Sequence, residues 1–434
     1  MDIKKAAEKA KRAAFELAAI PIDVKNSALA AVAEAIQTED VKIIAANLED
    51  CRRSEQEQLA MPLLKRLHFE DKKIEEVCLG IKNLISLPDP VGTTLSATEL
   101  DNDLELYKVS CPIGVIGVVF ESRPDALVQI SALCLKSGNA VLLKGGSEAS
   151  STNRTLADII HKATVKAGIP SGWMVLLETR DDVADMLSLD DYIDLVIPRG
   201  SNDFVRYIMD NTRIPVLGHA DGICHVYVDK AADINMAKRI CVDSKTQYVA
   251  VCNAAETILV HQDIAETFLP RLKSALTAKD VEIRGCKETA RIIDVRAVVE
   301  EDWKTEYLDL IVSVKVVESL DSAIAHINQY GSGHTDAIVT SDNDRAKRFL
   351  DYVDTADGFV NCSTRFSDGF RYGLGAEVGI STNKIHARGP VGLEGLVIYK
   401  WRLIGKGHIV ADYSGEGSRK FTHRKLDKRF VDIL

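Results

Sequence analysis

Cys252 stands in the stretch of the chain best suited to covalent chemistry. Residues 244–261 contain a turn, a short apolar rise to the cysteine, and a strand whose alternation begins at Thr257. Small neighbours leave the backbone N–H groups of Cys252 and Asn253 free to face a ligand, and a thiol at a strand mouth can serve as a nucleophile. Free cysteine is more often a small buried hydrophobe, so the rest of the chain must decide between the two interpretations.

Two glycine-containing turns are candidates for binding phosphate groups. Each follows an apolar strand and precedes a helix, so glycine permits close backbone approach and the helix offers unpaired N–H groups. A lysine at the last strand position of the first turn is suited to bond ribose or phosphate oxygens. Neither turn has the G-x-G-x-x-G spacing, and each could also be a plain strand–helix connection. The residues are Lys144, Gly145, Gly146 and Ser147 in the first turn, and Gly200 and Ser201 in the second.

Alternating strands and helices must position these residues. Residues 1–86 have helical periodicity, and residues 104–109 alternate like a strand of a small antiparallel ribbon. From Pro112 the pattern becomes repeated strand–helix units, and beyond Pro215 a second such system begins. This predicts an α/β fold with two doubly wound parallel sheets, which bind ligands outside the carboxyl ends of their strands.

The last part of the chain is less regular. Residues 366–395 are dense in glycine and polar side chains and show no periodicity, which predicts a long functional loop. A final strand is expected over residues 396–401. The basic tail at residues 419–429 is typical of solvated surface or a subunit contact.

Composition limits the classes of function. A chain of 434 residues predicts two or three domains. The formal charge of −10 argues against nucleic-acid or anionic-membrane binding. Nine cysteines without C-x-x-C or metal-ligand spacing indicate reduced thiols, no metal and a cytoplasmic location. No signal peptide is recognisable, and no apolar run reaches the roughly eighteen residues of a membrane helix.

These features together resemble the aldehyde dehydrogenase superfamily, and within it the γ-glutamyl phosphate reductase family. The matching segments run in order through most of the chain. No kinase domain precedes them, so the resemblance is to the free-standing reductases. The segments are residues 120–124, 136–139, 143–146, 197–202, 215–222, 245–247, 252–253, 335–337, 375–381 and 387–393.

The resemblance implies a reaction centred on Cys252, which matches the superfamily's nucleophile. Its thiolate is expected to attack L-glutamyl 5-phosphate, expel phosphate and form a thioacyl enzyme. Reduction by NADPH then gives L-glutamate 5-semialdehyde, a step of proline biosynthesis. The oxyanion is expected to be held by the N–H of Cys252 and one further donor; Ser122 stands where ordinary members carry an asparagine. Asn253 and His219 complete the expected catalytic set, and His219 replaces the glutamate that activates water in hydrolytic members.

The resemblance also suggests how cofactor and substrate are held. NAD-preferring relatives carry a glutamate three residues after the ribose lysine, whereas this chain has Ser147, beside Glu148, which predicts NADPH over NADH. Glu306 matches the glutamate that bonds the nicotinamide ribose. An arginine is the physical expectation for the substrate's α-carboxylate. Its candidates, between which the sequence does not choose, are Arg123, Arg365 and Arg388.

The resemblance also predicts how the chain is divided into domains. Residues 1–222 form the helical region and the NADPH-binding domain, with a ribbon strand at about 103–111. Residues 223–387 form the catalytic domain, and residues 388–434 the return segment, the oligomerisation strand and the basic tail. A homo-oligomer is expected, with a separate glutamate 5-kinase as a functional partner. The alternatives are another acyl-phosphate or acyl-thioester semialdehyde dehydrogenase, or a catalytically idle scaffold of the superfamily.

Overall fold

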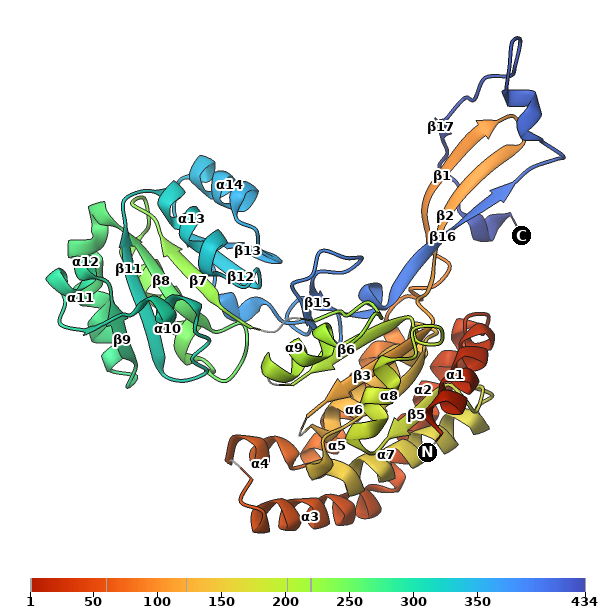
Figure 1. Cartoon of the computed structure of the whole chain (residues 1–434), viewed down its shortest axis with the longest axis horizontal. Helices are drawn as coiled ribbons and strands as arrows, with labels where there is room; N and C mark the ends of the chain where they lie inside the picture. The colour runs from red at the N-terminus through yellow and green to blue at the C-terminus, as the bar shows by residue number, and fades with distance from the viewer. Residues whose placement is uncertain (1, 60, 122, 201, 219–220, 434) are drawn as a thin grey trace.

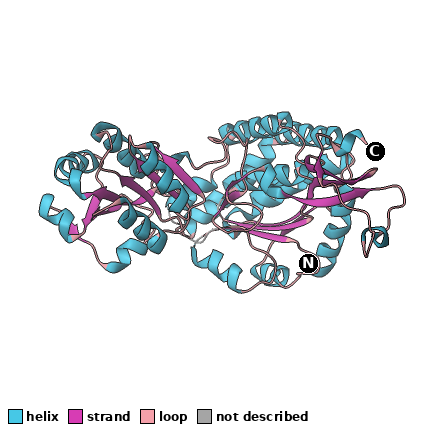
Figure 2. Ribbon diagram, turned by 90° about the horizontal axis from the view of Figure 1, so that it is seen from above, coloured by secondary structure: helices cyan, strands magenta, loops and turns pink. Residues whose placement is uncertain are grey.

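The computed structural model describes residues 2–59, 61–121, 123–200, 202–218 and 221–433. Two α/β bodies lie side by side, and a ribbon of antiparallel strands projects from the first of them (Figure 1). Seen from above, helices flank the strands of both bodies (Figure 2). The predicted fold class, two doubly wound α/β units with a small β ribbon, is confirmed.

Five helices begin the chain. In the second of them Leu29, Val32, Ala33 and Ile36 recur at helical spacing, and all four are buried. They join the core formed with the first sheet, so packing on that sheet holds the helical region in place. The helices are α1 (Ile3–Leu17), α2 (Ile22–Thr38), α3 (Asp40–Gln56), α4 (Met61–Leu67) and α5 (Asp71–Ser86).

The first sheet has four parallel strands in the order β5-β4-β3-β6. Ile116 and Val118 of β3 enter one core, whereas Val115 and Val119 enter another on the opposite face. Burial on both faces explains the continuous apolar run at this strand. The elements are β3 (Val115–Phe120), α6 (Pro124–Lys136), β4 (Ala140–Lys144), α7 (Ser150–Lys166), β5 (Met174–Leu177), α8 (Arg180–Leu187), β6 (Leu195–Arg199) and α9 (Asn202–Asp210).

The second sheet has seven parallel strands in the order β10-β9-β11-β8-β7-β12-β13. It too is buried on both faces, since Ile258 and Leu259 of β8 enter different cores. The strands are β7 (Cys224–Val228), β8 (Ala255–His261), β9 (Glu282–Gly285), β10 (Arg296–Ala297), β11 (Ile311–Val317), β12 (Thr335–Val339) and β13 (Asp357–Val360). The helices are α10 (Ile234–Thr246), α11 (Gln262–Thr277), α12 (Lys287–Ile292), α13 (Leu320–Tyr330) and α14 (Asn343–Tyr352).

The ribbon has four antiparallel strands in the order β16-β2-β1-β17. The strand predicted over residues 104–109 is β2 (Leu104–Pro112), and the one predicted over residues 396–401 is β16 (Val397–Ile404). The expectation that β16 ends the strand series is corrected, because β17 (Arg424–Lys425) follows it and pairs with β1 (Thr94–Asp101).

The glycine-dense region contains more regular structure than its sequence predicts. Residues 379–381 and 389–391 pair as a two-stranded antiparallel sheet, β14 (Gly379–Ser381) with β15 (Gly389–Val391). Val378 and Leu393 pack into the core of the first body. The chain therefore leaves the second body after β13 and crosses back near Val378. The division at residues 222 and 387 remains a prediction.

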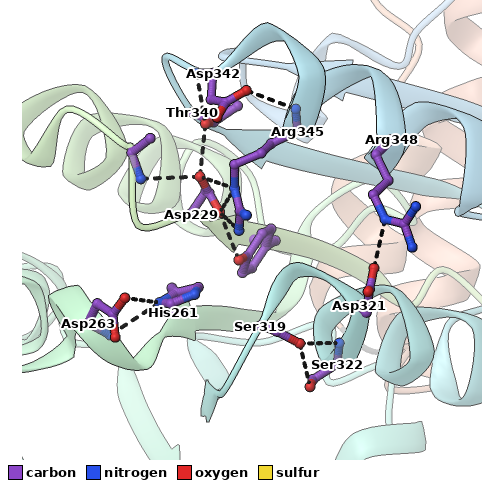
Figure 3. Close-up of polar contacts among 12 residues, drawn as sticks. Asp229, His261, Asp263, Ser319, Asp321, Ser322, Thr340, Asp342, Arg345 and Arg348 are labelled. Atoms are coloured by element: carbon purple, nitrogen blue, oxygen red, sulfur yellow. Dashed lines mark hydrogen bonds and ion pairs between the residues drawn. The ribbon is translucent and has the colours of Figure 1, made fainter.

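The carboxyl ends of β7, β8 and β12 are closed by a polar network (Figure 3). Asp229, just after β7, is fully buried and accepts hydrogen bonds from Arg345 Nε at 2.8 Å and from Thr340 Oγ1 at 3.0 Å. At the end of β8, His261 accepts a bond from the N–H of Asp263. Cys252 lies at the opposite, amino end of β8, so the rule that places ligands at carboxyl ends applies to the first sheet and not to the second.

Within the described residues, no helix is long and apolar enough to cross a membrane.

Candidate active site

Cys252 lies in the loop between α10 and β8, and its side chain is half-buried. Gly222, two residues before β7, packs directly against it. A methyl group at Gly222 would lie 2.3 Å from the carbonyl oxygen of Cys252 and 2.6 Å from its Cβ, so only glycine fits. Fold topology thus places Gly222 directly against the cysteine.

In the loop that carries Cys252, backbone N–H groups are available to a ligand, whereas the side chain of Asn253 is bound within the protein. The Nδ2 of Asn253 donates to the carbonyl oxygen of Ser367 at 2.6 Å, and the side chain is buried. Among the described residues, neither the N–H of Cys252 nor that of Asn253 donates a hydrogen bond. Asn253 therefore ties the cysteine loop to the segment after β13, while the two N–H groups stay available for an oxyanion.

A buried ion pair fixes both ends of this loop. Lys245, in the last turn of α10, contacts Glu256 in β8 at 2.6 Å, and their side chains are 0% and 1% exposed. Burial raises the pKa of Glu256 to about 7, although Lys245 acts in the opposite direction. Since Lys245 is engaged with Glu256, it is not free to act as a base toward Cys252.

Arg365 and Arg199 both lie near Cys252. Arg365, at the turn after β13, is buried and donates from Nε to Gln247 Oε1 at 2.9 Å. Burial lowers the pKa of Arg365, and nearby Arg371 adds to this effect. Arg199 is the last residue of β6 and belongs to the first body.

The other two candidate arginines differ in position. Arg123 lies beside Arg199 and forms an ion pair with Asp125 at 3.2 Å. Arg388 forms an ion pair with Asp354 at 3.0 Å and packs near Gly333. Its described contacts therefore lie at the amino end of β12 and β13, not at the thiol.

The first glycine turn forms a narrow cradle at the end of β4. A methyl group on Gly145 would lie 2.1 Å from Asn153 Nδ2, and one on Gly146 would lie 1.9 Å from Glu148 Oε1. Lys144 is buried there, and this burial lowers its pKa while the Glu148 carboxylate raises it. Ser147 is exposed at the rim of the cradle.

Arg53 of α3 reaches the same turn, a contact that no local pattern predicts. Its Nη2 donates to the carbonyl oxygens of Ser147 and Glu148, both at 3.1 Å. The guanidinium is 35% exposed and also pairs with Asp50 at 2.6 Å. The turn therefore has a cation beside Ser147 in addition to Lys144.

The second glycine turn meets the second body. Asn202, which opens α9, donates to Glu306 Oε2 at 2.9 Å and to Asp221 Oδ1 at 2.7 Å. Gly200 just before it is exposed, and a methyl group there would crowd Phe204 at 3.0 Å. Glu306 thus lies beside the second glycine turn. Asn202 also bonds Asp221, whose neighbour Gly222 packs on Cys252.

Known proteins share this arrangement along almost their whole length. The sequence profile of the aldehyde dehydrogenase family matches residues 1–292. The γ-glutamyl phosphate reductase of Pelotomaculum thermopropionicum is 65% identical over 99% of each chain. That of Acetivibrio thermocellus is 63% identical, over 99% of this chain and 100% of the other. The chain belongs to the γ-glutamyl phosphate reductase family.

Solved structures agree. The crystal structure of the γ-glutamyl phosphate reductase of Thermotoga maritima has a TM-score of 0.92 and 39% identity, covering 94% of this chain and 100% of that one. An acetylating aldehyde dehydrogenase of Geobacillus thermoglucosidasius, with a TM-score of 0.64 and 17% identity, shares the fold. The protein is thus an oxidoreductase of the aldehyde dehydrogenase family.

Several predicted site residues come together around the cysteine loop, and others do not. Arg365 lies near Cys252. The described contacts of Arg388 are with Asp354 and not with the cysteine loop. The side chain of Asn253 donates to the carbonyl oxygen of Ser367. Ser122, Ser201 and His219 lie outside the described residues. Arg199 was missed because its approach to Cys252 depends on the packing of two bodies. The motif at residues 197–202 was the only sequence signal that included it.

Proposed function

We propose that this reductase converts L-glutamyl 5-phosphate to L-glutamate 5-semialdehyde and phosphate with NADPH, as a step of proline biosynthesis. The observation that carries the proposal is the pair of hydrogen bonds that joins the Cys252 loop to the segment of Arg365, from Asn253 to Ser367 and from Arg365 to Gln247. Arg199 lies near the same thiol, and its buried Nη1 has no partner among the described residues. The substrate has an anionic group at each end, a phosphoryl group and an α-carboxylate. A nucleophile with two arginines near it suits such a molecule.

The chemistry would proceed on Cys252. Its thiolate attacks the acyl carbon, the bond to the phosphoryl oxygen breaks, and phosphate leaves with a thioacyl group remaining on Cys252. The N–H groups of Cys252 and Asn253, with Ser122 as a further donor, stabilise the oxyanion. After reduction, the tetrahedral adduct expels the Cys252 thiolate and releases the semialdehyde, and the proton consumed ends on phosphate. His219 stands in place of a water-activating glutamate, which disfavours hydrolysis of the thioester.

The cofactor site would be built from the two glycine turns. Asn153 and Glu148 pack so closely on Gly145 and Gly146 that a larger side chain would clash with them, and Lys144 stands beside the two glycines. Lys144 would bond the ribose, Gly200 and Ser201 would approach the phosphates, and Glu306 would accept from the nicotinamide ribose. NADPH supplies the hydride that reduces the thioacyl carbon. Ser147 is uncharged and Arg53 is cationic, so neither side chain repels a 2′-phosphate. Both therefore favour NADPH over NADH.

The proposal is tested with glutamate 5-semialdehyde, phosphate and NADP⁺, followed by nicotinamide absorbance. Reduction of NADP⁺ that requires phosphate supports it. Phosphate-independent reduction would point to a hydrolytic dehydrogenase, and reduction that requires coenzyme A in place of phosphate would point to an acyl-thioester enzyme. No reduction would favour a scaffold without catalysis.

Ser147→Glu is expected to reverse the cofactor preference. A carboxylate beside Lys144 would repel a 2′-phosphate and accept from a 2′-hydroxyl, so the ratio of kcat/KM for NADPH over NADH should fall by about 10- to 100-fold. Steady-state kinetics with both cofactors measure this ratio. Ser147→Ala is the control, with a change of less than about threefold. An unchanged ratio in the glutamate variant would refute the role of Ser147.

Arg365→Gln is expected to raise KM for the semialdehyde by about 10- to 100-fold, because a charge-assisted bond to the α-carboxylate is lost. Arg388→Gln, at an arginine paired with Asp354, should leave that KM within about threefold. Kinetics of both variants at saturating phosphate and NADP⁺ decide between the two. The reverse pattern would transfer the carboxylate site to Arg388.

A further inference from the structure

One guanidinium nitrogen of Arg199 has no hydrogen-bond acceptor among the described residues. Arg199 ends β6, where it pairs in register with Phe120 of β3, and its side chain lies near Gly379 of the returning chain. Its Nη1 is buried and has no hydrogen-bond partner among the described residues. Such an atom is costly, because an arginine keeps its charge under all ordinary conditions and its donors need acceptors.

The side chain of Arg199 lies next to the returning chain. Its stem runs past Gly379, where a methyl group would lie 3.9 Å from its Cγ and 4.0 Å from its Nε. Glu377, two residues earlier, accepts a hydrogen bond from the N–H of Gly369 at 2.7 Å and also lies near Arg199. The returning chain therefore forms one side of the surroundings of Arg199.

The nearby described carboxylates leave the Nη1 of Arg199 unpaired. Burial lowers the pKa of Arg199, and Arg123 beside it lowers it further, while Glu377 and Asp125 act in the opposite direction. Asp125 is engaged with Arg123 and Glu377 with the N–H of Gly369, and the Nη1 of Arg199 has no partner among the described residues. An anion that enters here can supply the missing acceptor, and the arginine fork matches phosphate geometry.

We propose that Arg199, together with Arg123, binds the phosphoryl group of the acyl-phosphate substrate and, in the reverse reaction, inorganic phosphate. This inference rests on the proposed function and assigns opposite ends of the substrate to different arginines. Arg365 holds the α-carboxylate from the second body, and Arg199 holds the phosphoryl group from the first. Negative charge grows on the phosphoryl oxygen as its bond to the acyl carbon breaks, so Arg199 also assists its departure.

The test follows the phosphate dependence of NADP⁺ reduction by glutamate 5-semialdehyde in Arg199→Gln. KM for phosphate should rise by about 10- to 100-fold, while KM for the semialdehyde and for NADP⁺ stays within about threefold. Arg123→Gln, at a side chain that is 43% exposed and outside the core, should raise KM for phosphate by about threefold to tenfold. Arg348→Gln, an exposed arginine of the second body (Figure 3), is the matched control with all constants unchanged.

A readout without turnover accompanies the kinetics. Inorganic phosphate should raise the thermal midpoint of the wild type and of Arg348→Gln, but not that of Arg199→Gln. A wild type without phosphate-dependent reduction would remove the proposed function itself. A normal wild type with an unchanged KM for phosphate in both Arg199→Gln and Arg123→Gln would overturn only this inference. An increase confined to KM for NADP⁺ would also overturn it, because Arg199 would then belong to the cofactor site.

Discussion

Cys252→Ser is expected to lower kcat by on the order of 10³-fold or more, the largest effect of any single substitution in this chain. A serine hydroxyl is a far weaker nucleophile than a thiolate, and the loop offers no base to activate it, since Lys245 is paired with Glu256. The substitution preserves the size of a half-buried side chain, so the thermal midpoint should change by no more than a few degrees.

Cys286→Ser provides the matched control. Cys286 is also a half-buried thiol, but it precedes α12 on the far side of the second sheet. Its replacement should leave kcat within about twofold. Substantial activity in Cys252→Ser, or an equal loss in Cys286→Ser, would be incompatible with a thioacyl enzyme at residue 252.

The second large effect is on stability. Lys245→Met removes the partner of a carboxylate that is 1% exposed, and we expect the free energy of unfolding to fall by about 3–5 kcal/mol. Burial raises the folded-state pKa of Glu256 above its unfolded value and Lys245 opposes this rise, so the pKa lies higher still in Lys245→Met. A raised carboxyl pKa means that folding binds a proton and that stability is lost as pH rises, and the variant loses more than the wild type. The deficit should therefore be larger near pH 8 than near pH 5.5. Urea unfolding at both pH values measures it.

The double variant Lys245→Met with Glu256→Leu is the corresponding control. Replacing both members of a buried ion pair with apolar side chains is often neutral, so the double variant should recover most of the lost stability. It should still turn over more slowly than the wild type if the pair positions the cysteine loop. A double variant as unstable as Lys245→Met alone would show that the pair itself is not the origin of the loss.

Much of this architecture follows from local patterns. The buried parallel strands were predictable because burial on both faces requires a continuous apolar run, and helix α2 was predictable from its periodic Leu29, Val32 and Ile36. Cys252 could be singled out because small residues surround it. Glycine turns could be found because a backbone cradle excludes larger side chains.

What sequence reasoning missed depends on contacts between distant segments. The hydrogen bond from the side chain of Asn253 to Ser367 joins residues 114 positions apart, so no local pattern predicts it. Arg53 and Arg199 reach their sites only after a helix or a second body has packed against them. The short strands β14 and β15 were missed because three-residue strands carry no periodicity, and β1 because its alternating residues are mostly half-exposed.

The proposed mechanism requires a γ-glutamyl group on Cys252, and this group can be trapped. The wild-type protein is incubated with glutamate 5-semialdehyde and NADP⁺ in the absence of phosphate, quenched in acid, digested and analysed by mass spectrometry. We predict a glutamyl adduct on the peptide that contains Cys252, and its disappearance when phosphate is added before the quench. An unmodified Cys252 peptide, or an adduct on another cysteine, would contradict the mechanism.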